Sequence, residues 1–420
     1  MLKVEDKDSD HIIFMSEIMK TFIHTMYYLP EFGSAPILMN ELASFLSSRG
    51  QNIDVVTTIP RPPHHKKFRC RIYQNESVSG FNVKRFRTNF TVHHVGRLVA
   101  WSIYTGFSIL NLFSVKKGDV LFLRLPPLQL GITGFFAKKL RGAKILLSVQ
   151  DIHPDLSIAS GLLKKSWAIR LAKRFEKWIY HNSDKIVVIS EGFKQNLEEK
   201  DVNSEKIEVI PNWVDTDILQ PHPKDNSLSQ KLSLNNKFVV MYSGTISLSS
   251  YMSLEKVLEA ASALKNETGL VFVFVGAGLK KPNLVQKAKD LDLNNVTFLP
   301  FQPYEDLPLL LAASDVLLVP LDEEKTQLSV PSKLYNYIAA GRPILGLTDS
   351  TSEVARIINE ANCGLNAEPE NVKKIVEQIL ELKNSEEKCE RFGTNARKHC
   401  VEFYSKDKVL SLYENSIVSL

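Results

Sequence analysis

The chain has 420 residues, of which 44% are hydrophobic and 24% are charged, and its formal net charge at pH 7 is +5. This length exceeds a single ordinary core and predicts two domains of roughly 200 residues each. The composition excludes a disordered, fibrous or disulfide-stapled protein, and the four cysteines lack metal-ligand spacing. No apolar run approaches the roughly 18 residues of a membrane span, so we expect a globular protein in a reducing cytoplasm.

The chain opens with an acidic segment, residues 1–18, which we interpret as an upstream extension, with translation starting at Met19. A predicted strand at 21–27 is followed by a turn-rich loop and by a helical pattern that stops at Gly50. Residues 53–58 predict the next strand. This β-loop-α-β order is typical of the start of a doubly wound parallel sheet.

Apolar runs predict the remaining strands in two groups. The first group lies at 120–123, 144–149 and 185–189, with helices expected at 130–140 and 167–180. The second group lies at 238–242, 270–275, 296–299, 316–319 and 343–347. We therefore predict an α/β protein with two Rossmann-like domains, 19–215 and 216–402. Ligands of such sheets bind outside the carboxyl ends of the strands, which directs attention to the loops after Tyr27, Val149, Tyr242, Val275 and Val319.

Charge is distributed unevenly along the chain. Residues 61–180 hold 22 Lys and Arg against 5 Asp and Glu, a net charge of +17, whereas the remainder holds 30 basic and 42 acidic residues, a net charge of −12. Such segregation predicts that one part of the molecule faces an anionic partner, and solvated surface charge is the alternative.

Six segments carry a resemblance to a known family. They are SVPSKLYNYIAAGRPIL at 329–345, YLPEFGSAP at 28–36, VQDIHPDLSIASGLL at 149–163, SDKIVVISEGFK at 183–194, IPNWVDTDIL at 210–219 and FLPFQPYEDLPLLLAASDVLLVPL at 298–321. Taken in chain order they resemble family 4 glycosyltransferases, and most closely the bacterial colanic acid, capsule and O-antigen branch. The resemblance implies a GT-B fold, a nucleoside-diphosphate-sugar donor, retention of anomeric configuration and no essential metal.

The same resemblance assigns roles to the domains. It implies that residues 19–215 bind the acceptor and that residues 216–402 bind the nucleotide-sugar. It also implies that the C-terminal helix, 403–420, crosses back to the first domain.

The PSK segment is the strongest donor-site candidate. Ser332 and Lys333 stand at the start of a helix expected at 334–340, where free N–H groups, a hydroxyl and a full positive charge favour a diphosphate. The alternative is an ordinary capped helix with a solvated lysine. Relatives carry two glutamates here, whose positions are taken by Leu328 and Asn336. An asparagine still accepts a ribose hydroxyl hydrogen bond without bringing charge.

Further donor-binding candidates follow the strands of the second domain. The loop with Gly244 and Thr245 offers only hydroxyls and backbone where many relatives carry Arg and Lys, which gives Lys333 more of the phosphate charge to neutralise. Gly276 permits close backbone approach to a nucleotide. Phe301 is expected near the base, or alternatively in the domain core.

Three candidates lie in the first domain. Gly33 follows the first strand, where it either brings backbone N–H groups to a donor phosphate or serves as a plain turn glycine. Asp151 and His153 follow the strand ending at Val149, where the resemblance implies a histidine-containing family motif: Gln150 and Asp151 take its place, and His153 stands where close relatives often have Trp. Asp151 is predicted to hydrogen-bond the donor sugar or to deprotonate the acceptor, and the alternative is an Asx-turn before Pro154.

The basic stretch includes an amphipathic helix around residues 164–180. Its predicted membrane- or acceptor-facing lysines are Lys164, Lys165, Lys173 and Lys177. Its apolar stripe either meets an anionic bilayer or packs on the first sheet, and it consists of Trp167, Leu171, Phe175 and Trp178. Residues 61–69 add a basic loop that suits a lipid diphosphate, and no nucleic-acid-binding motif appears.

Together these features predict a retaining glycosyltransferase that uses a UDP- or GDP-sugar and a lipid-linked saccharide acceptor in surface polysaccharide synthesis. We expect a cytoplasmic enzyme, peripheral at the inner face of the cell membrane. The alternatives are a GT-B nucleotide-sugar epimerase, which the basic stretch disfavours because an epimerase needs no membrane acceptor, and a non-catalytic sugar-nucleotide-binding protein.

Overall fold

The computed structural model describes residues 19–31, 33–60, 72–88, 94–246, 250–322, 328 and 330–420. The chain folds into two compact units, and each is considered by itself. The first unit holds the described residues up to Ser148, together with Asn182–Lys185 and Ile417–Leu420. The second unit holds Val149–His181 and Ile186–Ser416.

The first sheet has eight strands in the order β3-β4-β2-β1-β5-β6-β7-β8. Strand β1 pairs in parallel with β2 and β5, and β3 pairs antiparallel with β4 at the edge. Strand β5 is buried along its whole length, as its nearly unbroken apolar sequence predicts. The strands are β1 (Lys20–His24), β2 (Asn52–Thr58), β3 (Tyr73–Val78), β4 (Phe81–Phe86), β5 (Val120–Leu125), β6 (Lys144–Val149), β7 (Lys185–Val188) and β8 (Ile207–Val209).

Helices connect most of these strands. Helix α1 turns its apolar stripe, including Leu38, Leu42 and Leu46, to the core. The helices are α1 (Ser34–Ser48), α2 (His94–Leu110), α3 (Leu130–Phe136), α4 (Asp155–Ala159), α5 (Ser166–Asn182) and α6 (Glu191–Glu198), with short helical turns at Asn111–Ser114, Ala137–Arg141 and Ser204–Lys206.

The second sheet has six strands in the order β11-β10-β9-β12-β13-β14, and all its pairings are parallel. Its central strands are apolar and buried, and Phe272, Val240 and Leu318 lie in one contiguous core with α8 and α13. The strands are β9 (Phe238–Ser243), β10 (Leu270–Val275), β11 (Val296–Leu299), β12 (Val316–Pro320), β13 (Ile344–Leu347) and β14 (Gly364–Ala367).

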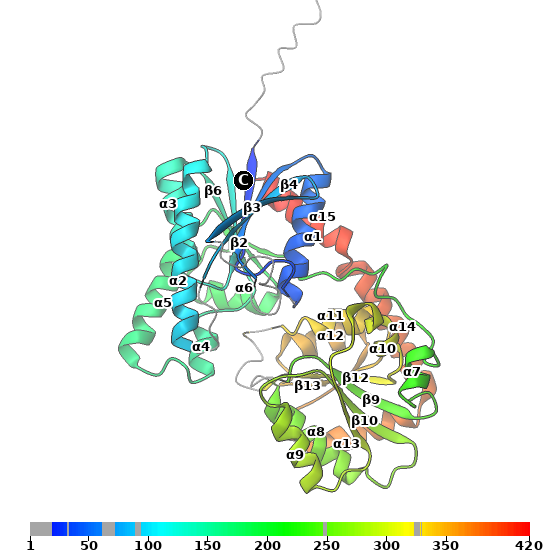
Figure 1. Cartoon of the computed structure of the whole chain (residues 1–420). Coiled ribbons are helices and arrows are strands. Elements are labelled where there is room, and N and C mark those ends of the chain that lie inside the picture. The colour runs from blue at the N-terminus through cyan, green and yellow to red at the C-terminus, as the bar shows by residue number, and fades with distance from the viewer. Residues whose placement is uncertain are drawn as a thin grey trace, which may run out of the picture. The chain divides into compact units, whose positions relative to one another are not determined.

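Helices cover both faces of this sheet, with α8, α9 and α13 on one side and α11, α12 and α14 on the other (Figure 1). None of the helices in the described ranges has the length and apolarity needed to cross a bilayer. The helices after the first sheet are α7 (Ser227–Lys231), α8 (Tyr251–Ala263), α9 (Lys281–Asp290), α10 (Leu307–Ala312), α11 (Lys333–Ala339), α12 (Glu353–Ala361), α13 (Val372–Lys383), α14 (Glu386–Phe403) and α15 (Lys406–Val418), with a short turn at Tyr304–Asp306.

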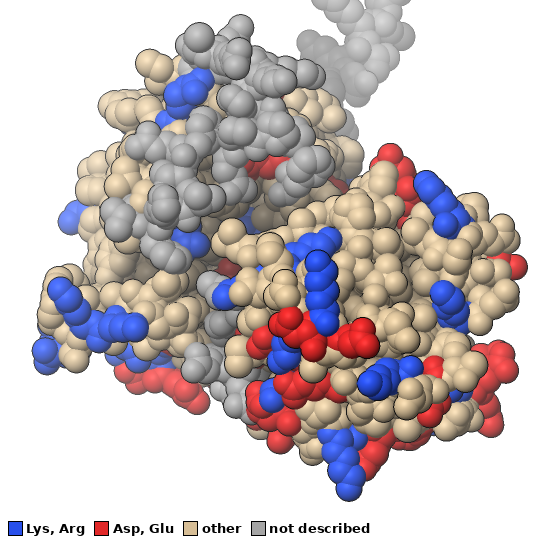
Figure 2. All heavy atoms as spheres, turned by 60° about the horizontal axis from the view of Figure 1, so that its bottom comes forward, with Lys and Arg blue, Asp and Glu red and all other residues tan. Residues whose placement is uncertain are grey.

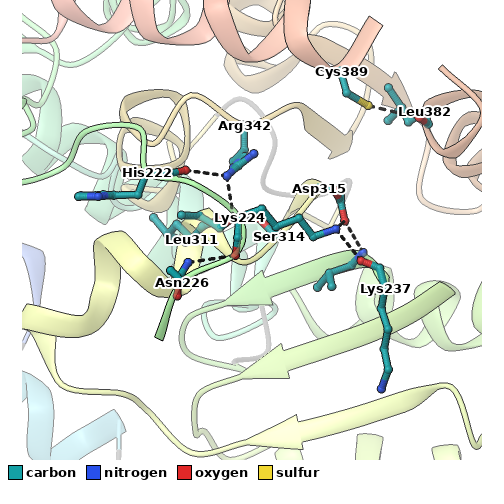
Figure 3. Close-up of polar contacts among 12 residues, drawn as sticks. His222, Lys224, Asn226, Lys237, Leu311, Ser314, Asp315, Arg342, Leu382 and Cys389 are labelled. Atoms are coloured by element: carbon teal, nitrogen blue, oxygen red, sulfur yellow. Dashed lines mark hydrogen bonds and ion pairs between the residues drawn. The ribbon is translucent and has the colours of Figure 1, made fainter. Parts of the chain in front are cut away.

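Polar contacts fasten the segment before β9 to the amino edge of the second sheet (Figure 3). Lys224 Nζ lies 2.5 Å from an Asp315 carboxylate oxygen, and the Val239 N–H donates to the same oxygen at 2.7 Å. Arg342 donates to the His222 carbonyl at 2.9 Å. The charge of Lys224 at this edge is therefore matched within the protein.

The predicted fold class, an α/β protein with two Rossmann-like sheets, is confirmed. Of the C-terminal helix predicted to return to the first domain, Ile417–Leu420 belong to the first unit and the residues up to Ser416 to the second, so the return of the whole helix stays a prediction. The predicted helix at 130–140 consists of α3 followed by a separate helical turn at Ala137–Arg141. The domain boundaries 19–215 and 216–402 remain predictions, and residues 1–18 and 61–69 lie outside the described ranges.

Candidate functional site

The strand order of the second sheet reverses between β9 and β12. The chain runs outward from β9 through β10 to β11, and then returns to the other side of β9 to form β12, β13 and β14. Open α/β sheets bind ligands outside the carboxyl ends of their strands at such a reversal. The candidate site therefore lies where β9 and β12 end.

Two glycines let the loops after β9 and β10 pack closely. The Gly244 N–H donates to the Val275 carbonyl at 2.9 Å, and the Gly276 N–H donates to the Leu299 carbonyl at 3.0 Å. A Cβ added to Gly276 would lie 2.0 Å from the Gly244 carbonyl oxygen, at a φ of 141°. Only glycine fits there without moving the neighbouring loop. The predicted donor-binding residues Gly244 and Gly276 are thus neighbours.

Lys281 and Phe301 lie beside the loop that follows β10. The Lys281 ammonium donates to the carbonyls of Gly276 and Leu299, both at 2.7 Å, and so ties the loop after β10 to the end of β11. The Phe301 ring comes within 3.4 Å of the position that a Gly276 Cβ would occupy. Its side chain is 54% exposed, so the alternative that Phe301 belongs to the domain core is wrong.

Lys333, the first residue of α11, lies against the end of β9. Its Nζ is 3.8 Å from the centroid of the Tyr242 ring, a cation–π distance. A Cβ on Gly244 would come within 3.0 Å of the same Nζ. The Tyr242 hydroxyl donates to the Thr245 carbonyl at 2.7 Å, which fixes the ring beneath the ammonium. The sequence reasoning treated this loop as hydroxyls and backbone only and missed the aromatic face of Tyr242.

The Lys333 ammonium has no carboxylate partner among the described residues. Although the residue keeps partial surface exposure, desolvation of the ammonium lowers the pKa of Lys333 to about 7. Burial raises the pKa of Tyr242 to about 12, so the ring beneath it stays a neutral phenol. A desolvated cation without an anionic neighbour is typical of a site that awaits an anionic ligand.

The other candidates around α11 are placed as follows. Ser332 precedes the helix in αR geometry, and its hydroxyl makes no capping bond. Asn336 lies one turn beyond Lys333 and is partly exposed. Thr245 is exposed, and its carbonyl holds Tyr242. The donor-binding roles of Ser332, Asn336 and Thr245 remain predictions.

In the first unit, Gly33 caps the start of α1 with a φ of 126°, a conformation that requires glycine. Among the described residues, a Cβ there would come within 4 Å of the Pro36 ring alone, at 3.9 Å. Gly33 and the residues around Lys333 belong to different units, and the predicted role of Gly33 stays a prediction.

Asp151 and His153 follow β6 directly, as predicted, in the loop that leads into α4. Both side chains are partly exposed. His153 Nδ1 lies 3.0 Å from the Ser157 hydroxyl, which orients the imidazole towards the first turn of α4. Their catalytic roles stay predictions.

A charge cluster around the buried Glu176 supports the α4 end of this loop, and no sequence pattern predicted it. Lys200 Nζ lies 2.8 Å from the Asp155 carboxylate at the start of α4 and 2.7 Å from that of Glu176 on α5. Glu176 is 1% exposed, and burial raises its pKa to about 7 against the lowering effect of Lys200. The cluster fastens α4 to α5. Lys200 stands far from both in the sequence, so no local pattern signals it.

The predicted membrane-facing lysines are all exposed. Lys177 pairs at 2.5 Å with Asp201, and Lys173 lies 4.0 Å from Asp155. Trp167 and Leu171 are each 61% exposed, so the alternative that they pack on the first sheet is wrong. Lys164 and Lys165 lie in the turn before α5.

Within the described part of the chain, no group of three or more His, Cys, Asp or Glu is arranged to hold a metal ion, and the expectation that no metal is essential stays a prediction. Cys363 and Cys400 are buried, and burial raises the pKa of each thiol to about 12. Neither thiol therefore supplies a nucleophile near neutral pH.

Two family models match the chain. The model described as "Glycosyl transferase 4-like domain" matches residues 36–213, and the model described as "Glycosyl transferases group 1" matches residues 224–399. The second match contains the loops of Gly244 and Gly276 as well as Lys333.

Similar proteins agree with these matches. WcaI of Escherichia coli (strain K12), named as a colanic acid biosynthesis glycosyl transferase, is 28% identical over 95% of this chain and 100% of WcaI. WbjE of Pseudomonas aeruginosa, named as a glycosyltransferase, is 30% identical over 64% of this chain and 70% of WbjE. The crystal structure of Anabaena HepE in complex with UDP shares the fold, with a TM-score of 0.72 and 15% identity over 96% of this chain and 100% of HepE. The chain therefore belongs to the group 1 glycosyltransferases and is an enzyme of the GT-B fold.

Proposed function

We propose that this enzyme is a retaining glycosyltransferase that moves a sugar from a UDP- or GDP-linked donor to a lipid-linked saccharide. The reaction would serve surface polysaccharide synthesis at the inner face of the cell membrane. The observation that carries the proposal is the Lys333 ammonium, which lies desolvated on the Tyr242 ring at the strand reversal of the second sheet and has no carboxylate partner among the residues that the structure describes.

A nucleoside diphosphate fits the chemistry of this position. Its phosphates would supply an anion to Lys333, for which the described residues provide none, and the backbone of the glycine loops would allow close approach. Phe301, half exposed beside Gly276, would stack on the base. The crystal structures of HepE with UDP and with UDP-glucose, which share this fold, support a nucleotide-sugar donor.

Retention of configuration can proceed without a protein nucleophile. The acceptor hydroxyl oxygen bonds to the anomeric carbon on the side from which the nucleoside diphosphate departs, and the bond to the phosphate oxygen breaks. The acceptor proton passes to that phosphate oxygen. Lys333 would stabilise the charge that develops on the leaving diphosphate, so electrostatic stabilisation is the main catalytic contribution. Asp151 would hydrogen-bond the donor sugar or take the acceptor proton instead.

Two observations support a lipid-linked saccharide as the acceptor: the name of a similar protein and the charge of residues 61–180. WcaI is named for colanic acid biosynthesis, a polysaccharide pathway. Residues 61–180 carry a net charge of +17, which suits an acceptor presented on a lipid diphosphate at an anionic surface.

The proposal is tested by incubating the purified full chain with a panel of UDP- and GDP-sugars, with and without lipid-linked saccharides. We expect release of a nucleoside diphosphate and a lengthened acceptor with an unchanged anomeric configuration. Conversion of the donor into an epimeric nucleotide-sugar without acceptor would instead establish the epimerase alternative. Nucleotide-sugar binding without any turnover across the panel would contradict the proposal.

A further inference from the structure

Helix α5 exposes its apolar side chains on one side. Trp167 and Leu171 are each 61% exposed and Trp178 is 37% exposed. At about 100° per residue these three positions lie within about 40° of one another around the helix axis. The opposite side of the helix is buried and includes Glu176, Ile179 and Tyr180. An amphipathic helix of an isolated globular protein turns its apolar side inward, whereas α5 turns two tryptophans outward.

The exposed charges that α5 and the turn before it place around this outer face are all basic, and one of them, Lys177, pairs with the exposed Asp201. From Leu162 to Trp178 the only acidic residue is Glu176, which is buried and paired with Lys200. The exposed basic residues of the segment are Lys164, Lys165, Arg170, Lys173, Arg174 and Lys177. Figure 2 shows Lys and Arg side chains gathered at the left-hand corner of that view, where the turn between α4 and α5 lies in Figure 1.

The inner side of the helix holds the outer face in place. Lys200 joins Glu176 to Asp155, and the Phe175 ring stacks on Trp178 with centroids 6.1 Å apart. The outward tryptophans are therefore presented by an anchored helix, which reduces the entropy lost when they insert into a partner.

Exposed tryptophans surrounded by basic side chains fit an anionic bilayer better than a protein partner. Tryptophan rings prefer the boundary between headgroups and acyl chains, and lysine and arginine stems reach from there to anionic headgroups. A protein partner of complementary chemistry would need both an apolar pocket and a surrounding acidic surface, whereas an anionic bilayer offers both features everywhere.

We propose that the outer face of α5, formed by Trp167, Leu171 and Trp178 with their basic neighbours, docks on the surface of an anionic phospholipid bilayer. This inference deepens the proposed function and rests on it in one respect, because a lipid-linked acceptor gives the docked enzyme its substrate. The tryptophans insert at the interface, and the basic side chains bind the headgroups.

Co-sedimentation with vesicles tests the inference. We expect the full chain to bind vesicles that contain phosphatidylglycerol and not vesicles of phosphatidylcholine alone. Binding should weaken as salt rises, because screening shortens to about 8 Å at physiological ionic strength. The double variant Trp167→Ala/Leu171→Ala should reduce partitioning at least about tenfold, since both side chains are lost from the interface.

Matched variants distinguish docking through α5 from the effect of changing any exposed lysine or aromatic side chain. Lys164→Glu/Lys165→Glu should abolish binding, whereas reversal of the adjacent exposed pair Lys373 and Lys374 on α13 should leave it unchanged. Phe403→Ala, at a side chain 51% exposed, is the control for Trp167→Ala. Thermal melts of every variant establish that the fold is intact.

Several outcomes would overturn the inference. These are equal binding to neutral and anionic vesicles, no binding at all, or equal losses in the α5 and control variants. Concentration-dependent dimers that disappear with Trp167→Ala/Leu171→Ala, without vesicle binding, would assign the face to a second copy of the chain. Donor hydrolysis by the unaltered protein without vesicles reports on the proposed function separately, so the two failures are distinguishable.

Discussion

Two lysines of the second unit, Lys224 and Lys333, stand at opposite edges of the same sheet. Lys224, at the amino edge, lies 2.5 Å from the Asp315 carboxylate and also donates to the Lys237 carbonyl at 2.5 Å. Lys333, at the carboxyl edge, faces the Tyr242 ring and has no carboxylate within the described ranges. Both are partly exposed, so exposure does not account for the difference.

The difference lies in what balances each charge. At the amino edge the protein supplies the counter-charge itself, which fastens the segment before β9 to the sheet. At the carboxyl edge none of the described residues supplies a counter-charge to Lys333, and desolvation lowers the pKa of its ammonium. We infer that the first lysine serves the fold and that the second awaits the phosphates of a donor.

The largest expected effect is the loss of turnover when Lys333 is replaced. Lys333→Met should lower turnover at least about 100-fold, because a desolvated contact to the departing phosphate contributes a few kcal/mol in the transition state. Steady-state kinetics with the donor sugar measures the effect. Lys224→Met is the matched control and should stay within about threefold of the unaltered enzyme. Comparable losses in both variants would mean that Lys333 acts through folding alone.

The next prediction concerns Asp151, in the loop after β6, as a second charged residue with a proposed role in the reaction. Asp151→Asn keeps the size and removes the charge, so turnover should fall by about tenfold or more if the carboxylate acts as a base. The KM for the donor should rise less than turnover falls. A change confined to KM would make Asp151 a binding residue. Measuring kcat and KM separately decides between these roles.

The pH dependence of nucleotide binding sharpens the comparison. With a pKa of about 7, Lys333 is protonated below pH 7 and loses its charge above it, unless a bound phosphate holds the proton. UDP keeps a constant charge there, since a terminal phosphate titrates near pH 6. Affinity for the diphosphate should therefore fall up to about tenfold per pH unit above 7. In Lys333→Met, the diphosphate affinity measured by calorimetry should not change with pH in this range. If the affinity of the variant falls with pH as steeply as that of the unaltered protein, the titrating group is not Lys333.

The smallest expected effects concern stability, and they have opposite signs. The folded pKa of Lys333 lies below its unfolded value near 10.4, so its burial destabilises the folded state fully below pH 7 and progressively less up to about pH 10. Lys333→Met should thus raise the free energy of unfolding by about 1–2 kcal/mol at pH 7, less than the pKa difference implies because the side chain keeps some exposure.

The paired lysine should behave in the opposite way. Lys224→Met leaves the Asp315 carboxylate without its cation and should lower the free energy of unfolding by about 1 kcal/mol or more. Urea titrations of the two variants measure both changes. Destabilisation by Lys333→Met would contradict the assignment of Lys333 to the binding site.

The strands of the second sheet were the most predictable part of the fold. The predicted bounds of β10 and β11 agree with the structure, because parallel strands buried on both faces are continuous apolar runs. The edge hairpin of β3 and β4 was not predicted, since its strands mix polar and basic side chains with few apolar ones.

The candidate site was predictable in its residues and not in its contacts. The family motif identified Lys333, and the strand order explains why it stands beside Gly244 and Gly276. The Tyr242 ring beneath the ammonium and the Lys200 bridge behind Asp155 join residues far apart in the chain. Such contacts depend on tertiary packing, which leaves no periodic signal in the sequence.

The central claim, that Lys333 binds the donor diphosphate, is tested most directly by calorimetric titration of the intact chain at pH 7. UDP, GDP and their nucleosides are titrated into the unaltered protein, Lys333→Met and Lys224→Met. For the diphosphate that binds, Lys333→Met should raise Kd at least about tenfold and leave nucleoside affinity unchanged, because only the phosphate contact is lost. A diphosphate Kd within twofold of the unaltered protein, or an equal loss in Lys224→Met, would contradict the account.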